Sequence, residues 1–313
     1  MQPDPKDYSF KLDDVFAATV LIRAAVPGDA FTAETLGTER AGNGVIIRGD
    51  GLVLTIGYLV TEAESIWITL VDGRVVPGHV LAFDQETGFG LIQALARLDV
   101  KAAAIGRSAD ISPGEPVIVA GGGGIRSAVA ARVVAKHEFA GYWEYVLDEA
   151  IFTAPAHPNW GGTAVIGPAG ELIGIGSLLV QQSGEGGRAR DLNMVVPIDL
   201  LPPILDDLVT TGRANRPPRP WLGIYATELA GNIVIADFAR RGPGASSDLR
   251  SGDIVISVAG HDVGDLADFF RSIWGVGEAG CPVPLVVHRD GRAMEVTVQS
   301  GERRKFLKSP VTH

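Results

Sequence analysis

Short apolar runs separated by turn signals fill the first two-thirds of the chain. Strand-like runs lie at residues 18–24, 44–48, 52–55, 65–70, 90–95, 116–120, 129–136, 145–152, 164–166, 172–179 and 194–196. Turn signals stand between some of them at Asp50-Gly51, Asp72-Gly73 and Pro168-Ala169-Gly170, where glycine supplies the positive φ that hairpins require. Many short strands joined by tight turns are typical of a barrel or a sandwich.

The pattern changes after residue 197. Apolar residues at 200, 201, 204, 205 and 208 follow the helical period, and Gly212 stands where a helix C-cap would, which predicts a helix at 198–211. Residues 213–220 are polar and rich in proline, and they mark a domain boundary. Beyond it we expect strands at 222–225, 233–237, 254–258, 283–288 and 294–299, a helix at 265–274, and a frayed basic tail.

Composition narrows the class of protein. Hydrophobic residues make up 46% of the chain and charged residues 20%, and each long apolar run is broken by glycine, proline or a charge. This excludes a disordered chain and a transmembrane span. The 40 glycines and 19 prolines follow no collagen period and fit many tight turns. The net charge of −10 has the wrong sign for binding nucleic acid, so we expect no such partner.

Candidate metal and redox residues are few. Cys281 is the single cysteine, which excludes an internal disulfide framework and a cysteine-rich zinc site. His79 and His137 form no spaced pair and share no acidic cluster, so we expect neither a metal nor a cofactor. The N-terminus carries acidic residues and prolines where an export signal needs positive charge and then an apolar stretch. This predicts a cytoplasmic location, or a periplasmic one if a leader has been removed.

Four segments, taken in order, carry a family resemblance. They are Gly42-Asn43-Gly44-Val45-Ile46-Ile47, Gly51-Leu52-Val53-Leu54-Thr55, Gly170-Glu171-Leu172-Ile173-Gly174-Ile175 and Val196-Pro197-Ile198-Asp199. They are similar to the G-S-G-V-I-I, G-Y-I-L-T, G-E-V-I-G-I and A-I-P-I-D segments of the HtrA family of serine proteases. The resemblance implies a mainly β fold with a trypsin-like double β-barrel at 10–199, a helix and linker at 200–220, a PDZ domain at 221–302 and a basic tail at 303–313.

The family's catalytic positions fall on unsuitable side chains. Tyr58 stands where the resemblance places the general-base histidine, Gly88 where it places the orienting aspartate, and Trp160 where it places the nucleophilic serine. A phenol with a pKa near 10 does not accept a proton at neutral pH, and an indole cannot attack a carbonyl. Pro158 replaces the glycine whose N–H would help to form the oxyanion hole, and proline has no N–H. We therefore predict a pseudoprotease that is not an enzyme.

A rebuilt catalytic site is the alternative. His157 lies in the loop that matches the nucleophile loop, and Thr153 or Thr163 is the best nucleophile that could pair with it, although no nearby carboxylate is evident. Otherwise His157 is a solvent-facing loop residue. For Trp160, the two interpretations are a buried plug of the cleft and a partly exposed residue that contacts a partner.

The second domain keeps a recognisable binding motif. Trp221-Leu222-Gly223-Ile224 resembles the carboxylate-binding loop of the family's PDZ domains, where glycine lets successive N–H groups converge on the terminal carboxylate of a peptide. The helix at 265–274 is expected to line the groove with one apolar stripe that includes Phe270, although a core position is the stronger interpretation for each aromatic there. The implied partners are peptides or protein C-termini.

Three functions follow from the sequence. The first is a peptide-binding adaptor, the second is a regulatory subunit that assembles with an active HtrA protease, and the third is an enzyme with a rebuilt site. The family resemblance also implies a homotrimer that would depend on the N-terminal segment, with Tyr8, Phe10 and Phe16 as candidate contact residues.

Overall fold

The chain forms two compact units. The computed structural model describes residues 2–183 and 189–308, so the last part of the expected tail lies outside the described residues. The first unit runs up to His137 and continues through Glu149–Asn215. The second unit combines Arg216–Lys308 with Glu138–Asp148, the tip of a hairpin whose strands continue into the first unit. The sequence-based boundary near residue 220 missed this segment because it assumed that each domain is contiguous.

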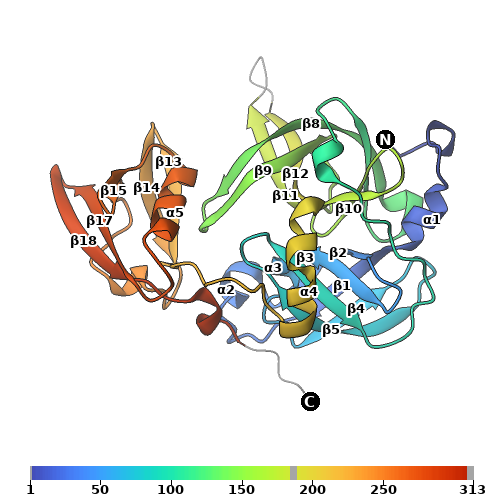
Figure 1. Ribbon diagram of the computed structural model, residues 1–313, viewed down its shortest axis with the longest axis horizontal. Helices are drawn as coiled ribbons and strands as arrows, with labels where there is room; N and C mark the ends of the chain where they lie inside the picture. The colour runs from blue at the N-terminus through green and yellow to red at the C-terminus, as the bar shows by residue number, and fades with distance from the viewer. Residues whose placement is uncertain (1, 184–188, 309–313) are drawn as a thin grey trace. The chain divides into compact units, whose positions relative to one another are not determined.

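The first barrel is closed by six antiparallel strands in the order β1-β2-β3-β6-β5-β4. Figure 1 labels β1 to β5 of this barrel. The strands are β1 (Thr19–Ala25), β2 (Glu39–Ile46), β3 (Leu52–Ile56), β4 (Ser65–Thr69), β5 (Val75–Phe83) and β6 (Phe89–Ala94). The sequence pattern missed β5, because Pro77 and Gly78 interrupt the strand and are read as breakers. Pro77 faces Trp67 and Gly78 faces Ile66, so both are accommodated within the pairing with β4.

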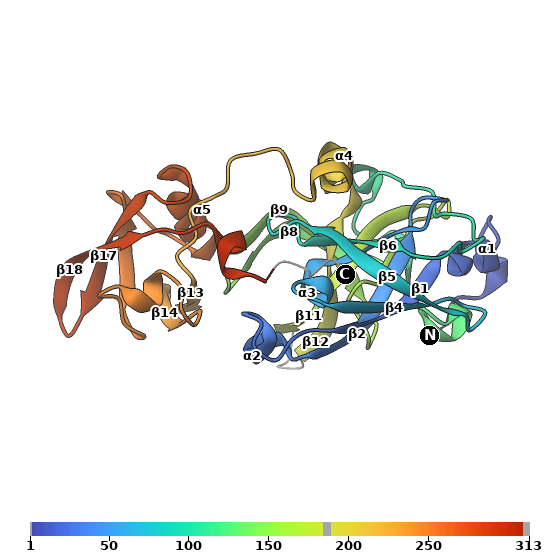
Figure 2. The ribbon, with the colours of Figure 1, turned by 90° about the horizontal axis from the view of Figure 1, so that it is seen from below.

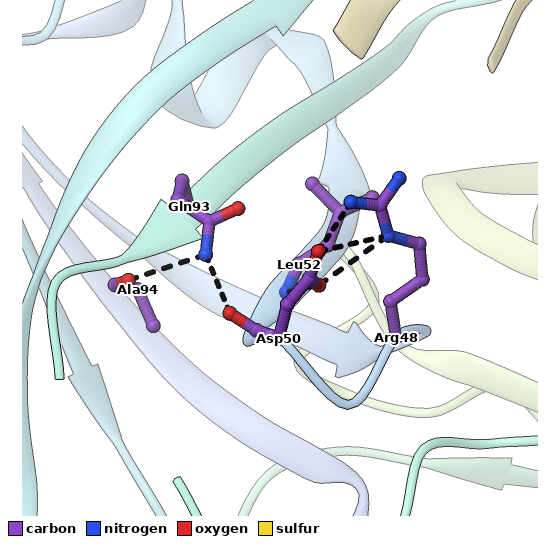
Figure 3. Close-up of polar contacts among 5 residues, drawn as sticks. All are labelled: Arg48, Asp50, Leu52, Gln93 and Ala94. Carbon is purple, nitrogen blue, oxygen red and sulfur yellow. Dashed lines mark hydrogen bonds and ion pairs between the residues drawn. The ribbon is translucent and has the colours of Figure 1, made fainter. Parts of the chain in front are cut away.

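The predicted turn between β2 and β3 is present (Figure 3). Gly51 has φ +87°, which an L side chain rarely adopts. The Asp50 carboxylate accepts a hydrogen bond from the N–H of Leu52 at 3.3 Å and forms an ion pair with Arg48. The Gln93 amide on β6 donates to the carbonyl of Asp50 at 2.7 Å. The turn is therefore tied to a neighbouring strand as well as to itself.

The second barrel closes in the order β10-β11-β12-β9-β8-β7. The strands are β7 (Pro116–Ala120), β8 (Ala128–Gly141), β9 (Tyr145–Ala154), β10 (Ala164–Ile166), β11 (Leu172–Ser183) and β12 (Ala189–Pro197). Buried branched residues fill the core, among them Val119, Ile151 and Val195. The two closed barrels confirm the predicted double β-barrel. Strand β8 is longer than predicted and carries the chain into the hairpin tip.

Helices of the first unit are short. They are η1 (Pro5–Asp7), α1 (Leu12–Ala17), α2 (Ala33–Leu36), α3 (Gly57–Val60), η2 (Ser108–Asp110), η3 (Gly124–Ser127), η5 (Ile198–Leu200) and α4 (Pro202–Thr211). Helix α3 packs beside β2, β3, β5 and β6 of the first barrel, and Figure 2 labels α3 together with β2, β5 and β6. The predicted helix after residue 197 is η5 followed by α4, which ends at Gly212 in the left-handed region.

The second unit is a sheet with one α-helix of ten residues. Its strands are β13 (Ile224–Leu229), β14 (Asn232–Phe238), β15 (Ile254–Val258), β16 (His261–Asp262), β17 (Pro282–Arg289) and β18 (Arg292–Gln299). They follow the order β13-β14-β15-β17-β18, with β16 paired to β15, so β13 stands at one end of the sheet. Its helical segments are η6 (Gly244–Ser246), α5 (Leu266–Gly275) and η7 (Arg303–Phe306).

Helix α5 is fixed at its first turn and along one face. Asp265 is its N-cap and accepts a hydrogen bond from the N–H of Asp268 at 2.7 Å. The buried side is apolar and includes Phe269 and Phe270, as the sequence period predicts. The expectation of a frayed tail is wrong at its start: η7 is ordered because Phe306 packs on the Trp221 ring, with centroids 4.9 Å apart. Among the described residues, no helix has the length and apolar character to cross a membrane.

Candidate functional site

The three positions that resemble the family triad lie together in the first unit. Tyr58 is on α3, Gly88 is in the loop between β5 and β6, and Trp160 is in the loop between β9 and β10. The Gly57 N–H at the start of α3 donates to the Gly88 carbonyl at 2.6 Å. The backbone next to Trp160 lies against Tyr58, because a Cβ at Gly161 would come within 2.6 Å of the Tyr58 hydroxyl. The folded chain therefore brings these positions to one place between the two barrels.

Tyr58 is a bridge between the barrels. Its hydroxyl donates to the carbonyl of Ser177 on β11 at 2.7 Å. Burial raises the pKa of the phenol well above its usual range, although the Trp160 side chain opposes the shift. Near neutral pH the phenol therefore keeps its proton and acts as a hydrogen-bond donor. Trp160 itself is half-buried, between the two interpretations that the sequence left open.

Asn43 holds the loop that carries Trp160. Its N–H donates to the Gly161 carbonyl at 2.9 Å, and its side-chain amide donates to the Asn159 carbonyl at 2.8 Å. Its side-chain oxygen accepts from the Gly122 N–H at 2.9 Å. Sequence reasoning missed this residue. The available signal was Asn43 itself, which stands in the first motif where the resembling family has serine.

His157 does not form the predicted substitute site. Only 2% of the residue is exposed, so it is not a solvent-facing loop residue either. Its Nδ1 accepts from the Asn159 N–H at 3.1 Å, and its Nε2 donates to the Ser127 carbonyl at 3.1 Å. Burial lowers the pKa of the ring, and these two hydrogen bonds oppose that shift. Both nitrogens are therefore engaged by the backbone, which leaves no base for a threonine.

Neither candidate nucleophile, Thr163 or Thr153, has its hydroxyl hydrogen-bonded to His157. The Thr163 hydroxyl donates to the Trp160 carbonyl at 2.9 Å. The Thr153 hydroxyl is buried and, within the described part of the chain, has no hydrogen-bond partner. Pro158 is exposed in the same loop and has no N–H to offer an oxyanion. Among the described residues, no group of three histidine, cysteine or acidic side chains is arranged to hold a metal ion.

The loop that resembles a carboxylate-binding loop lies in the second unit and surrounds a carboxylate. Glu144, in the tip of the β8–β9 hairpin, accepts hydrogen bonds from three successive N–H groups. The distances are 3.3 Å from Leu222, 2.6 Å from Gly223 and 3.0 Å from Ile224. The Glu144 carboxylate therefore occupies the position at which the family resemblance predicts the terminal carboxylate of a peptide.

The conformation of the loop depends on Gly223. Its φ of +70° lies in the left-handed region, and a Cβ there would come within 3.0 Å of the Trp221 ring. Trp221, Leu222 and Ile224 are each at least nine-tenths buried. Residues Trp221–Ile224 therefore form a loop whose apolar side chains are buried. Its backbone N–H groups are the polar groups that contact Glu144.

Burial shifts the pKa values of Glu144 and of the neighbouring Arg303. It raises the pKa of the Glu144 carboxyl to about 7, against the opposing effects of the three N–H donors and of the Arg303 charge. Burial also lowers the pKa of Arg303. Arg303 Nη1 donates to the Trp143 carbonyl at 3.5 Å, and its Nε is buried with no hydrogen-bond partner within the described part of the chain. The loop thus offers both converging N–H groups and a nearby cation.

Two further groups of the hairpin tip contact other parts of the second unit. The Tyr142 carbonyl accepts from the Ala226 N–H on β13 at 3.0 Å. Val146 belongs to the buried apolar cluster that contains Leu222, Ile224 and Phe270. Phe270 is fully buried in this cluster, which matches the stronger of its two interpretations. Sequence reasoning missed Glu144, Tyr142 and Arg303, because no local pattern marks residues that act through a distant partner.

Two family models match the chain, one on each side of the segment that follows the second barrel. Residues 42–175 match the trypsin-like peptidase domain family, and residues 220–299 match the PDZ domain family. Among curated proteins, the serine protease Do-like HtrA of Lactobacillus helveticus is 25% identical over 84% of this chain and 69% of its own length. A probable periplasmic serine endoprotease DegP-like of Halomonas elongata is 29% identical over 83% of this chain and 56% of its own length.

Other relatives and solved structures agree. A probable periplasmic serine endoprotease DegP-like of Pseudomonas fluorescens is 25% identical over 84% of this chain, which spans little more than half of that relative, 56%. The structure of the HtrA-type protease AlgW with a decapeptide has a TM-score of 0.55 and 20% identity, and the match covers 96% of this chain and 98% of that one. At this identity the structural likeness shows the fold.

These relatives correct one prediction. The chain was predicted not to be an enzyme, whereas proteins named serine endoproteases match it over more than four-fifths of its length. The prediction is contradicted because it considered four positions, while the similarity extends through both barrels and the second domain. In domain order, fold and sequence the chain is similar to HtrA-type proteases, with a match to the trypsin-like peptidase domain family followed by a match to the PDZ domain family.

Proposed function

We propose that this chain binds peptides or protein C-termini through its PDZ domain and acts as an adaptor. One observation carries the proposal: the N–H groups of Leu222, Gly223 and Ile224 converge on a single carboxylate. A loop that holds the carboxylate of Glu144 in this way has the geometry to hold the terminal carboxylate of a peptide.

The neighbouring strand and apolar cluster support the same ligand. β13 stands at the end of its sheet, where an extended peptide can add as a further strand. The Ala226 N–H already donates to a carbonyl from outside the sheet, that of Tyr142. Val146 of the hairpin tip enters the buried apolar cluster that also contains Leu222 and Ile224 of the loop, which favours a peptide with an apolar last residue.

The test compares two peptides on the full chain. A fluorescent peptide that ends in valine with a free carboxylate is expected to bind. The same peptide with a C-terminal amide is expected to bind at least about tenfold more weakly, because the amide replaces one acceptor oxygen with an N–H donor that faces the N–H donors of the loop. Fluorescence polarisation measures both. Equal affinity for the two peptides would refute recognition of the terminal carboxylate.

Gly223→Glu is expected to abolish this binding. The new side chain meets the Trp221 ring at 3.0 Å, requires a left-handed backbone, and brings negative charge to the loop. Gly231→Glu is the matched control: Gly231 also has positive φ, +76°, but has open space around its Cβ position. If both variants bind the peptide as the unmodified chain does, the loop is not the binding site.

Endoproteolysis is a second candidate function, favoured by the names of the relatives. Tyr58 and Trp160 stand at the positions that resemble the family's histidine and serine, so hydrolysis would need other groups of the cleft. Casein digestion by the purified chain that a fluorophosphonate blocks would support this candidate. Absence of digestion and of labelling at high protein concentration would exclude a serine-type activity while leaving peptide binding in place.

A further inference from the structure

The hairpin tip presents to the PDZ loop the groups that a bound peptide would present. The Glu144 carboxylate supplies the acid, at 2.6 Å from the Gly223 nitrogen. The Tyr142 carbonyl supplies the backbone acceptor for β13, at 3.0 Å from the Ala226 nitrogen. Val146 supplies an apolar side chain that enters the buried cluster of the PDZ domain. All three come from five consecutive residues.

The tip is held in this arrangement by contacts of its own. Glu144 adopts φ +59°, a left-handed conformation that costs energy for a residue with a side chain. The Trp143 and Tyr145 rings stack with centroids 5.6 Å apart, and the Tyr142 ring packs edge-on against Tyr225 of β13 at 5.7 Å. Such a backbone persists only where its surroundings stabilise it, and here the three N–H groups of the loop do so.

Arg271 fixes the base of the tip to α5. Its guanidinium forms an ion pair with Glu138 on β8 and with Asp148 on β9, both at 2.5 Å. These three side chains are exposed, so each pair contributes little to stability and can open. The tip is therefore anchored by a reversible contact at its base and by a buried carboxylate at its end.

We propose that the β8–β9 hairpin tip is an internal ligand of the PDZ domain, and that an incoming C-terminal peptide binds by displacing Glu144 from the Leu222–Gly223–Ile224 loop. This inference rests on the proposed function of the loop. Only one carboxylate can occupy the three N–H groups, so the two ligands exclude each other.

Peptide affinity, measured on variants of the 313-residue chain, tests the competition. A site that is open for only a fraction of the time binds with an affinity reduced by that fraction. Glu144→Ala removes the internal carboxylate, and we expect it to raise the affinity for the valine-ended peptide at least about tenfold. Glu149→Gln is the matched control, because Glu149 lies on the same hairpin but pairs with Lys136 of β8, and it is expected to leave the affinity unchanged.

Glu144→Gln is the second variant, for the case that Glu144→Ala does not fold. It keeps the shape of the side chain and can still accept from Gly223 and Ile224, so a smaller gain of affinity is expected. Hydrogen exchange on the unmodified chain gives an independent measurement: saturating peptide is expected to accelerate exchange in the segment Glu138–Asp148.

The outcomes separate the two proposals. If the unmodified chain and the Glu144 variants bind the peptide equally well, within a factor of two, the internal ligand is refuted and carboxylate recognition stands. Bound peptide with unchanged exchange in the hairpin tip refutes displacement in the same way. If neither the unmodified chain nor any Glu144 variant prefers a free carboxylate over an amide, the function of the loop fails, and the internal-ligand proposal fails with it.

Discussion

Arg40 shows how one buried charge organises the neighbourhood of Tyr58. The residue is 5% exposed, and its guanidinium donates to the carbonyls of Tyr58 at 2.8 Å and of Thr61 at 2.9 Å. It also donates to the Thr32 hydroxyl, which in turn donates to Glu62. Burial lowers the pKa of Arg40, and the Glu62 charge opposes the shift. The network joins α2, α3 and the start of β2.

We expect Arg40→Ala to lower the free energy of unfolding by about 3 kcal/mol, because it leaves the buried carbonyls of Tyr58 and Thr61 without their donor and removes the positive charge near the buried Glu62 carboxylate. Urea unfolding followed by circular dichroism measures the change. Arg48→Ala is the control: Arg48 pairs with Asp50 on the surface (Figure 3), and its loss is expected to cost less than about 1 kcal/mol. Similar losses of unfolding free energy in the two variants would mean that the buried network of Arg40 stabilises the fold no more than the surface ion pair of Arg48 does.

The β8–β9 hairpin carries a buried carboxyl group, that of Glu144, whose pKa is raised by its burial. The carboxyl of Glu144 has a pKa of about 7 when docked, above the value near 4.3 of an exposed glutamate. Arg303 of η7 and Tyr225 of β13 face it; arginine stays charged in proteins, and burial raises the pKa of Tyr225 further from neutrality. Glu144 is therefore the group near this loop that titrates around neutral pH.

The sign of the pH effect follows from proton linkage. The docked carboxyl binds more protons than the released one, so docking is strongest below the pKa of the released form and weakens as pH rises through about 7. We expect the affinity of the unmodified chain for the valine-ended peptide to increase between pH 5 and pH 8, by at most about tenfold per pH unit. Glu144→Gln is expected to remove this dependence, and titrations at four pH values measure it.

Prediction of elements succeeded where a local pattern was complete. Helix α5 has an N-cap and a helical stripe, and β7, β10 and β15 have bounds that match the predicted runs. β5 was missed because Pro77 and Gly78 interrupt its pattern, although both are tolerated in the pairing with β4. The length of β8 was underestimated: the strand ends at Gly141, whereas the apolar run that predicted it ends at residue 136. Its residues near Gly141 continue into the tip that packs in the second unit.

At the scale of the whole molecule, assembly remains a prediction. The N-terminal residues Tyr8 and Phe10 are half-buried and pack together, with ring centroids 5.5 Å apart. Phe16, the third candidate contact, is 2% exposed within the first unit and has no surface to offer a second subunit. A trimer would therefore have to use other residues than Phe16.

The sequence by itself determined the two-domain organisation, the double barrel and the position of the Trp221–Ile224 loop, because these depend on strand periodicity, turn glycines and motif order. It also located Tyr58, Gly88 and Trp160. Only the tertiary structure decided what these sites contact. Glu144 lies 79 residues from Gly223 along the chain, and Tyr58 lies 119 residues from Ser177. Hydrogen bonds between such distant residues depend on the packing of the whole fold, and no local pattern encodes them.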